Sequence, residues 1–140
     1  MSNVKRYKIS HNWNDGMEVE LEVDHDILTP ERAAMINNFW SNNDGRESEA
    51  GGAVPAVIRL FGACAINAML AEGGAEFGRN DTERQRVWSE DLRQEEGWGG
   101  EYDTDTPPAE PPLFGWCGIR VLSATVETAE FSSLELKELP

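Results

Sequence analysis

The chain has 140 residues, a length that favours a single domain with its own hydrophobic core. Its hydrophobic content of 39%, with five Trp and five Phe, excludes the composition typical of disordered chains. The formal net charge of -14, from 26 acids and 12 Lys plus Arg, argues against direct binding to nucleic acid or anionic membranes and favours basic partners. The alternative is that the acidity only keeps the protein soluble.

Cysteine usage and the N-terminus predict a cytoplasmic protein. The chain has two cysteines, Cys64 and Cys117, and its first residues, "MSNVKRYK", lack the apolar core of a secretory signal. The longest apolar stretch, residues 53–71, is interrupted by Pro55 and Arg59. We therefore expect it to fall short of the roughly 20 clean apolar residues that span a bilayer.

Two alternating segments at the N-terminus predict a β-hairpin. The stretch "MEVELEVD" sets apolar residues between acids, and "KRYKISHNW" alternates in the same way before it. A loop of Asn14, Asp15 and Gly16 satisfies both faces of the hairpin. This register predicts the following pairs: Trp13–Met17, His11–Val19, Ile9–Leu21, Tyr7–Val23, Lys8–Glu22 and Arg6–Asp24. The acids then form the solvent face of an amphipathic sheet.

Three helices are expected after the hairpin. The first covers residues 29–40, with Thr29 as its N-cap, and a polar loop follows at 41–52. The second covers 53–74, is apolar nearly all round and should lie at the centre of the core, where its small residues allow close packing on the sheet. The third, at 80–97, begins with a capping box of Asn80 and Glu83 and should turn Val87, Trp88 and Leu92 inward.

The last part of the chain predicts a loop and then β-structure. Residues 99–115 form a Pro-rich acidic loop, and residues 118–140 favour one long bent strand or two strands. The fold class is therefore α+β: an antiparallel sheet, made of the N-terminal hairpin plus the C-terminal strand or strands, with three helices packed on one face. Residues 1–140 are expected to be one domain.

No motif in the sequence indicates a particular reaction. We expect no catalytic residues, no metal and no cofactor. Asp24, His25 and Asp26 resemble a metal or acid–base cluster, but in a strand the middle side chain points away from the other two. A polar cluster that turns the chain is the preferred interpretation. His11 is expected on the apolar face as a core histidine, and the two cysteines lack zinc-ligand spacing.

Acid density is the remaining functional signal. From Glu90 to Glu110 the chain carries eight acids and one base, Arg93. Acids among exposed aromatic residues can dock on a basic groove, although a solvated loop has the same composition. The candidate partner-binding residues are Glu18, Glu20, Glu22, Glu95, Glu96, Trp98, Glu101, Tyr102, Asp103, Asp105 and Trp116.

Several segments resemble the domain-of-unknown-function family 2528, small acidic bacterial proteins often carried on phages and other mobile elements. They are "YKI", "EVELEVDHDILTPE", "INNFW", "AVIRLFGA", "GGAEFG", "EEGW" and "GIRV". The likeness covers residues 5–98 and 117–139, and the stretch 101–115 is longer here than the family pattern. The resemblance implies no catalytic activity. It implies a setting in which small acidic proteins often block host defence.

Three functional hypotheses follow. The first is a non-enzymatic inhibitor that binds a basic, nucleic-acid-handling host protein such as a CRISPR surveillance complex or a restriction enzyme, with mimicry of DNA as one route. The second is a structural or regulatory module, homodimeric in one version, that binds through Trp98, Phe114 and Trp116. The third is a small enzyme or metal-binding protein that uses Asp24, His25 and Asp26.

Overall fold

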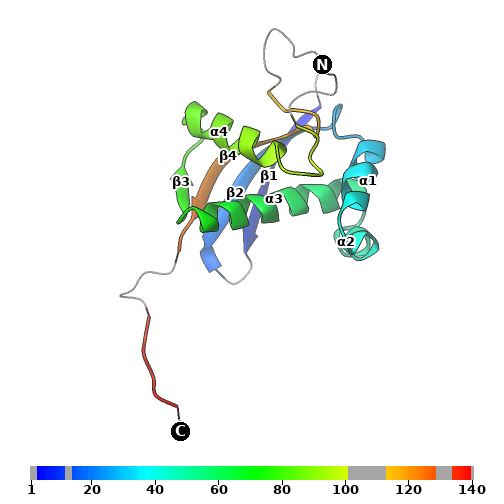
Figure 1. Cartoon of the computed structure of the whole chain (residues 1–140). Helices are drawn as coiled ribbons and strands as arrows, with labels where there is room; N and C mark the ends of the chain where they lie inside the picture. Colours follow the sequence, from blue (N-terminus) through cyan, green and yellow to red (C-terminus); the bar gives the residue numbers. More distant parts are fainter. Residues whose placement is uncertain (1–2, 12–13, 101–112, 129–133, 140) are drawn as a thin grey trace.

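The computed structural model describes residues 3–11, 14–100, 113–128 and 134–139. The elements in chain order are β1 (Val4–His11), β2 (Asn14–Asp24), α1 (Pro30–Phe39), α2 (Asn43–Ala50), α3 (Ala53–Ala71), β3 (Ala75–Phe77), α4 (Thr82–Arg93) and β4 (Ile119–Val126). The strands form one antiparallel sheet in the order β1-β2-β4-β3 (Figure 1). The α+β class and the N-terminal hairpin are confirmed, but the described residues contain four helices, not three.

The hairpin keeps the predicted faces but not the predicted register. Tyr7 pairs with Leu21 and Ile9 with Val19, two residues away from the expected partners. The predicted turn was wrong because β2 already begins at Asn14, and a register shift lies between Ser10 and His11. A shift by two residues does not change which side chains share a face, so the apolar and the charged residues still lie on opposite faces of the hairpin. The expected Trp13 pair lies outside the described residues, and His11 is exposed, not in the core.

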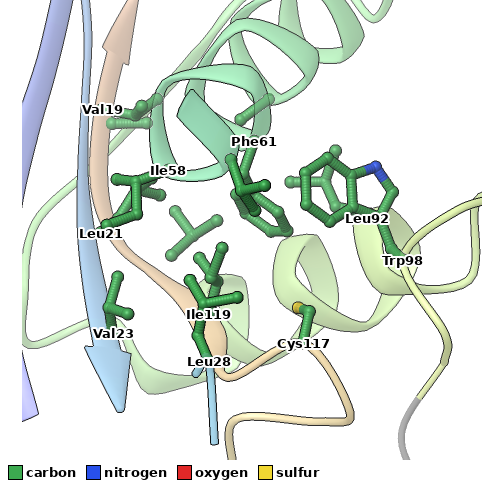
Figure 2. Packing of buried hydrophobic residues seen from close by; sticks show 14 of the residues in the cluster. Val19, Leu21, Val23, Leu28, Ile58, Phe61, Leu92, Trp98, Cys117 and Ile119 are labelled. Atoms are coloured by element: carbon green, nitrogen blue, oxygen red, sulfur yellow. The ribbon is translucent and has the colours of Figure 1, made fainter. Parts of the chain in front are cut away.

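The core lies between the sheet and α3. Val19, Leu21 and Val23 are fully buried on one side of β2, opposite Phe61 of α3 (Figure 2). Trp98 joins this cluster, with its ring edge-on to Phe61 at a centroid distance of 5.0 Å. α1 and α2 contact α3 and lie at its N-terminal end, while α4 lies along β4 (Figure 1). α3 contacts β1, β2 and β4, and α4 contacts β4, so these two of the described helices pack on the sheet.

The segment after α1 is a helix, not the predicted loop. α2 covers Asn43–Ala50, and none of its residues is buried. Its Arg46 donates hydrogen bonds to the backbone carbonyls of Asn37, Trp40 and Ser41 and to the side-chain oxygen of Asn37. These carbonyls belong to the end of α1, where backbone acceptors have no partner within the helix. Arg46 thus holds α2 against α1. This tertiary contact compensates for the weak intrinsic helix propensity of the segment.

α3 packs closely against β1, as its small residues predicted. A Cβ atom placed on Gly62 would come within 2.6 Å of the Ile9 side chain. By length and composition alone, α3 is apolar enough to cross a membrane, which corrects the expectation that it falls short. Core helices of soluble proteins also meet this criterion, and here Val57, Phe61 and Met69 pack into the core. The predicted cytoplasmic location remains a prediction.

α4 begins at a different cap from the predicted one and presents a different face to the sheet. Asp81, not Asn80, accepts a hydrogen bond from the backbone N–H of Arg84. Leu92 is buried as expected and Trp88 is half-buried, but Val87 is exposed. The row that turns inward is polar: Gln85, Ser89 and Arg93 are all buried.

This polar row closes part of an open sheet edge. β3 pairs with only three residues of β4, from Val126 to Ala124. Beyond that point, side chains of α4 take the backbone groups of β4: Ser89 accepts from the N–H of Val121, Gln85 donates to the carbonyl of Leu122, and Arg93 donates to the carbonyl of Ile119. Positions four apart lie on one face of a helix, so one stripe of α4 replaces a neighbouring strand.

The C-terminal β-structure is a single regular strand, β4, within the described residues. Strand β3 was not predicted, because three residues between glycines carry too little alternation to indicate a strand. Residues 134–139 have no regular secondary structure and are exposed. Figure 1 shows this segment, in red, running away from the sheet.

Candidate functional site

The predicted acidic row on β2 is a ladder of ion pairs. Glu20 accepts two hydrogen bonds from Arg79, at 3.0 and 2.7 Å, and a third from the Ser123 hydroxyl. Glu22 lies between Arg6, at 3.1 Å, and Arg120, whose nearest nitrogen is 2.7 Å from the carboxylate. These carboxylates are committed to bases of the same chain.

The weakest pair of the ladder is at its end. The ammonium nitrogen of Lys8 lies 3.7 Å from the carboxylate of Glu18, and both side chains are well exposed. Sequence reasoning foresaw that bases of β1 would face these acids, but not that Arg79 and Arg120 would complete the ladder. The three predicted acids therefore share one face, as expected, but they do not present a free row of negative charge.

Hydrogen bonding lowers the acid pKa values in the ladder. The hydrogen bonds from Arg79, helped by Ser123, lower the pKa of Glu20 from 4.5 to about 2. Burial by itself raises the pKa of Glu22, but hydrogen bonds from Arg120 and Arg6 outweigh it, and the net pKa is lowered. Both groups are therefore ionised at neutral pH, with their charges neutralised locally.

Asp24, His25 and Asp26 form a turn that leads from β2 to α1. Asp24 accepts a hydrogen bond from the backbone N–H of Asp26 at 2.9 Å, and the Tyr7 hydroxyl lies 2.7 Å from His25 Nε2. Burial, with the nearby Lys5, lowers the pKa of His25. Within the described residues, no group of three or more His, Cys, Asp or Glu side chains has the arrangement of a metal site.

The predicted aromatic anchors are less accessible than the sequence suggested. Trp98 is 1% exposed and belongs to the core, so it offers no surface to a partner. Trp116 is half-buried, with the Arg32 guanidinium 4.6 Å from its ring centroid, and Arg32 also donates to the Trp116 carbonyl at 2.9 Å. Both rings pack with the hydrophobic core: Trp98 lies within it, and Trp116 is partly buried against it.

A second acidic surface lies between α3 and α4 and carries free charge. Glu72 at the end of α3 and Asp91 and Glu95 at the end of α4 line a cleft of about 320 Å³, with Trp88 in its wall. All three acids are exposed, and no ion pair joins them to a base within the described part of the chain. The cleft can accept a cationic side chain against an aromatic wall.

The predicted acids after α4 divide between this cleft and the region next to it. Glu95 lies in the cleft, and Glu96 is exposed beside it. Glu101, Tyr102, Asp103 and Asp105, and most of the Pro-rich loop at 99–115, lie outside the described residues. Sequence reasoning missed Glu72 and Asp91 as part of the cleft, because they belong to helices whose mutual packing the sequence does not show.

Comparison with known proteins places the chain in a phage context. It is 31% identical over 121 residues to protein ea10 of Escherichia phage lambda, a match that covers 86% of this chain and 84% of the relative. The lambda prophage-derived protein ea10 of Escherichia coli O6:H1 matches with the same identity and coverage. No solved structure matches.

The family model for proteins of unknown function DUF2528 matches residues 18–136, from the charged face of β2 to the C-terminal segment. The chain therefore belongs to the DUF2528 family.

Proposed function

We propose that this protein binds a basic surface of a nucleic-acid-handling host protein through the acidic cleft between α3 and α4. The class of partner is a host defence protein, as for an anti-CRISPR or anti-restriction inhibitor. The observation that carries the proposal is the contrast between two groups of acids. Those on the sheet are neutralised by Arg6, Arg79 and Arg120, whereas Glu72, Asp91 and Glu95 pair with no base among the described residues.

The phage setting supports this choice of partner. The relatives carry names of phage lambda and prophage proteins, and a phage gains from proteins that act on the host. The net charge of -14 speeds encounter with a basic protein, and a local cleft gives the encounter a specific place. Mimicry of DNA would then rest on this cleft and not on the ladder of β2.

The alternative, a module that binds through Trp98, Phe114 and Trp116, has less support. Trp98 is buried, and Phe114 and Trp116 are half-buried beneath the guanidinium groups of Arg120 and Arg32. An apolar interface of this kind would require these contacts to open first.

Two variants of equal net charge test the proposal. The cleft variant carries Glu72→Gln, Asp91→Asn and Glu95→Gln, and the control carries Glu31→Gln, Asp44→Asn and Glu127→Gln at exposed positions elsewhere. Each is used to capture proteins from a host lysate at low and high salt. We expect the control and the wild type to retain a basic nucleic-acid-binding protein that salt elutes and that duplex DNA displaces, and the cleft variant to lose it.

The same experiment can contradict the proposal. Equal loss of capture by both variants would show that only net charge matters. Equal retention by both would show that the cleft is not the binding surface. A partner that resists salt would favour apolar binding.

A further inference from the structure

The two edges of the sheet differ in how far they are already occupied. At one edge, β3 has three residues, and Arg84 donates to its Glu76 carbonyl at 2.8 Å. The other edge is β1, with eight residues and, among the described strands, β2 as its only neighbour. An edge strand of this length presents a row of backbone N–H and C=O groups that can pair with another extended segment.

The C-terminal segment, residues 134–139, has the pattern of a strand without a sheet. Its leucines are strongly exposed: Leu134 by 63%, Leu136 by 101% and Leu139 by 78%. The sequence "LELKEL" alternates apolar and charged residues over its first four positions, as a half-buried strand does. In the single chain, no described residue therefore covers the leucines of this segment.

The charges of the two segments are complementary. β1 carries three of the chain's 12 bases, Lys5, Arg6 and Lys8. These bases disfavour pairing of β1 with a second β1, because like charges opposite one another destabilise a sheet. The C-terminal segment carries Glu135 and Glu138 and one base, Lys137, so it offers the opposite sign.

One antiparallel register matches the two segments on both faces. It sets Leu134 opposite Ile9, Glu135 opposite Lys8, Leu136 opposite Tyr7, Lys137 opposite Arg6, Glu138 opposite Lys5 and Leu139 opposite Val4. The half-buried side chains of Tyr7 and Ile9 then continue their apolar row, and the one like-charged pair involves Arg6, which Glu22 already neutralises. A slip by one residue sets leucines opposite Lys8 and Arg6.

We propose that β1 of one copy receives residues 134–139 of a second copy as an additional antiparallel strand, with the exchange reciprocal. In the single chain the segment runs away from its own sheet (Figure 1), so its apolar face is available to another molecule. Every copy carries both surfaces, and reciprocal exchange therefore forms a closed dimer. Neither β1 nor residues 134–139 line the acidic cleft between α3 and α4, so this proposal does not depend on the function of the cleft.

A charge exchange tests the proposal and identifies the partner copy. Lys5→Glu alone sets two acids opposite one another, at positions 5 and 138, and Glu138→Lys alone sets two lysines there. We expect each variant to dimerise about tenfold more weakly than the wild type in analytical ultracentrifugation. An equimolar mixture of the two variants should restore the dimer, because both strand pairs of a mixed dimer join opposite charges. One pair has the wild-type charges at positions 5 and 138, and the other pair has the same two charges exchanged. The mixed dimer is therefore compared with a double variant that carries both substitutions in one chain.

The double variant gives the sharper expectation. With Lys5→Glu and Glu138→Lys in the same chain, both strand pairs of a reciprocal dimer join opposite charges again. We expect this variant to dimerise as strongly as the wild type, although each of its substitutions alone weakens the dimer. Arg59→Glu and Glu127→Lys, at exposed positions outside the two strands, provide the charge-matched controls and should leave dimerisation unchanged.

Two further measurements complete the test. Leu136→Glu should abolish the dimer while leaving the circular dichroism spectrum unchanged, and hydrogen exchange should slow in residues 5–10 as the wild type dimerises. A wild type that stays monomeric as its concentration rises would overturn the proposal, including the case in which the segment binds β1 of its own chain. So would a double variant that dimerises no more strongly than either single variant.

Discussion

Ser89 Oγ accepts a hydrogen bond from the backbone N–H of Val121 at 2.8 Å, and both residues are almost completely buried. A helix side chain here occupies the place that a strand carbonyl would take in a wider sheet. Gln85 and Arg93, one turn to either side, donate hydrogen bonds to the backbone carbonyls of Leu122 and Ile119. The contact between α4 and the sheet therefore depends on polar groups as well as on apolar packing.

Removing this acceptor should weaken the fold. We expect Ser89→Ala to lower the free energy of unfolding by about 1–2 kcal/mol, because the N–H of Val121 would be left buried without a partner. Urea denaturation measures the change, and hydrogen exchange should show the Val121 amide opening more often. Ser48→Ala, at an exposed position of α2, should change stability by less than about 0.5 kcal/mol. Equal effects from the two substitutions would contradict this role.

The Glu20–Arg79 pair should make stability depend on pH. Folding lowers the pKa of Glu20 from 4.5 to about 2, so the carboxylate stabilises the native state fully above pH 4.5. That contribution is lost progressively as the pH falls from 4.5 towards 2. We expect Glu20→Gln to cost about 1–2 kcal/mol at pH 7 and progressively less as the solution is acidified. Urea titrations of both proteins at a series of pH values give the difference.

Glu31→Gln provides the control for this titration, because Glu31 is exposed on α1, away from the ladder. Its effect should be small at every pH. A cost of Glu20→Gln that stays constant down to about pH 3 would show that the folded-state pKa of Glu20 is not lowered.

Arg46 should stabilise the corner between α1 and α2 through its shape as well as its charge. We expect Arg46→Ala to cost about 2–3 kcal/mol, because several backbone carbonyls of the corner lose a charged donor. Arg46→Lys should recover less than half of this, since an ammonium cannot reproduce the fork of a guanidinium. Thermal unfolding measures both variants. Arg59→Ala, which removes an exposed arginine paired to Glu49 at 3.4 Å, should be nearly neutral.

Gly62 should resist substitution because of Ile9. We expect Gly62→Ala to lower stability by about 1–3 kcal/mol, despite the better helix propensity of alanine, because its Cβ would lie 2.6 Å from the Ile9 side chain. Combining it with Ile9→Ala should cost less than the sum of the two single changes. Additive costs in this double-mutant cycle would mean that the two positions are not in contact.

Local patterns predicted the elements that depend on local physics. Alternation placed the apolar and charged faces of β1 and β2, and Thr29 with Pro30 indicated the start of α1. The hairpin register was missed because an irregularity beside His11 moves the turn, and alternation does not record such a shift. The helix α2 was missed because Arg46 stabilises it through contacts with α1.

The candidate site depended on distant parts of the chain and was predicted less well. Glu22 and Arg120 are 98 residues apart in sequence, and Glu20 and Arg79 are 59 apart, so neither ion pair could be read from spacing. The exposed Glu95 and Glu96 were found from acid density alone. Trp98 was misjudged because a tryptophan among acids and glycines looks like a surface residue until the core that surrounds it is known.

The polar stripe of α4 also gives the sheet a direction in which it can grow. With one side sealed by Gln85, Ser89, Arg93 and the short β3, a new strand has its place beside β1. A sheet that is open on both sides can be extended without limit, as in a fibril. One that is closed on one side can be extended only from the other side, which here is β1. The polar face of α4 therefore restricts extension of the sheet to the β1 side.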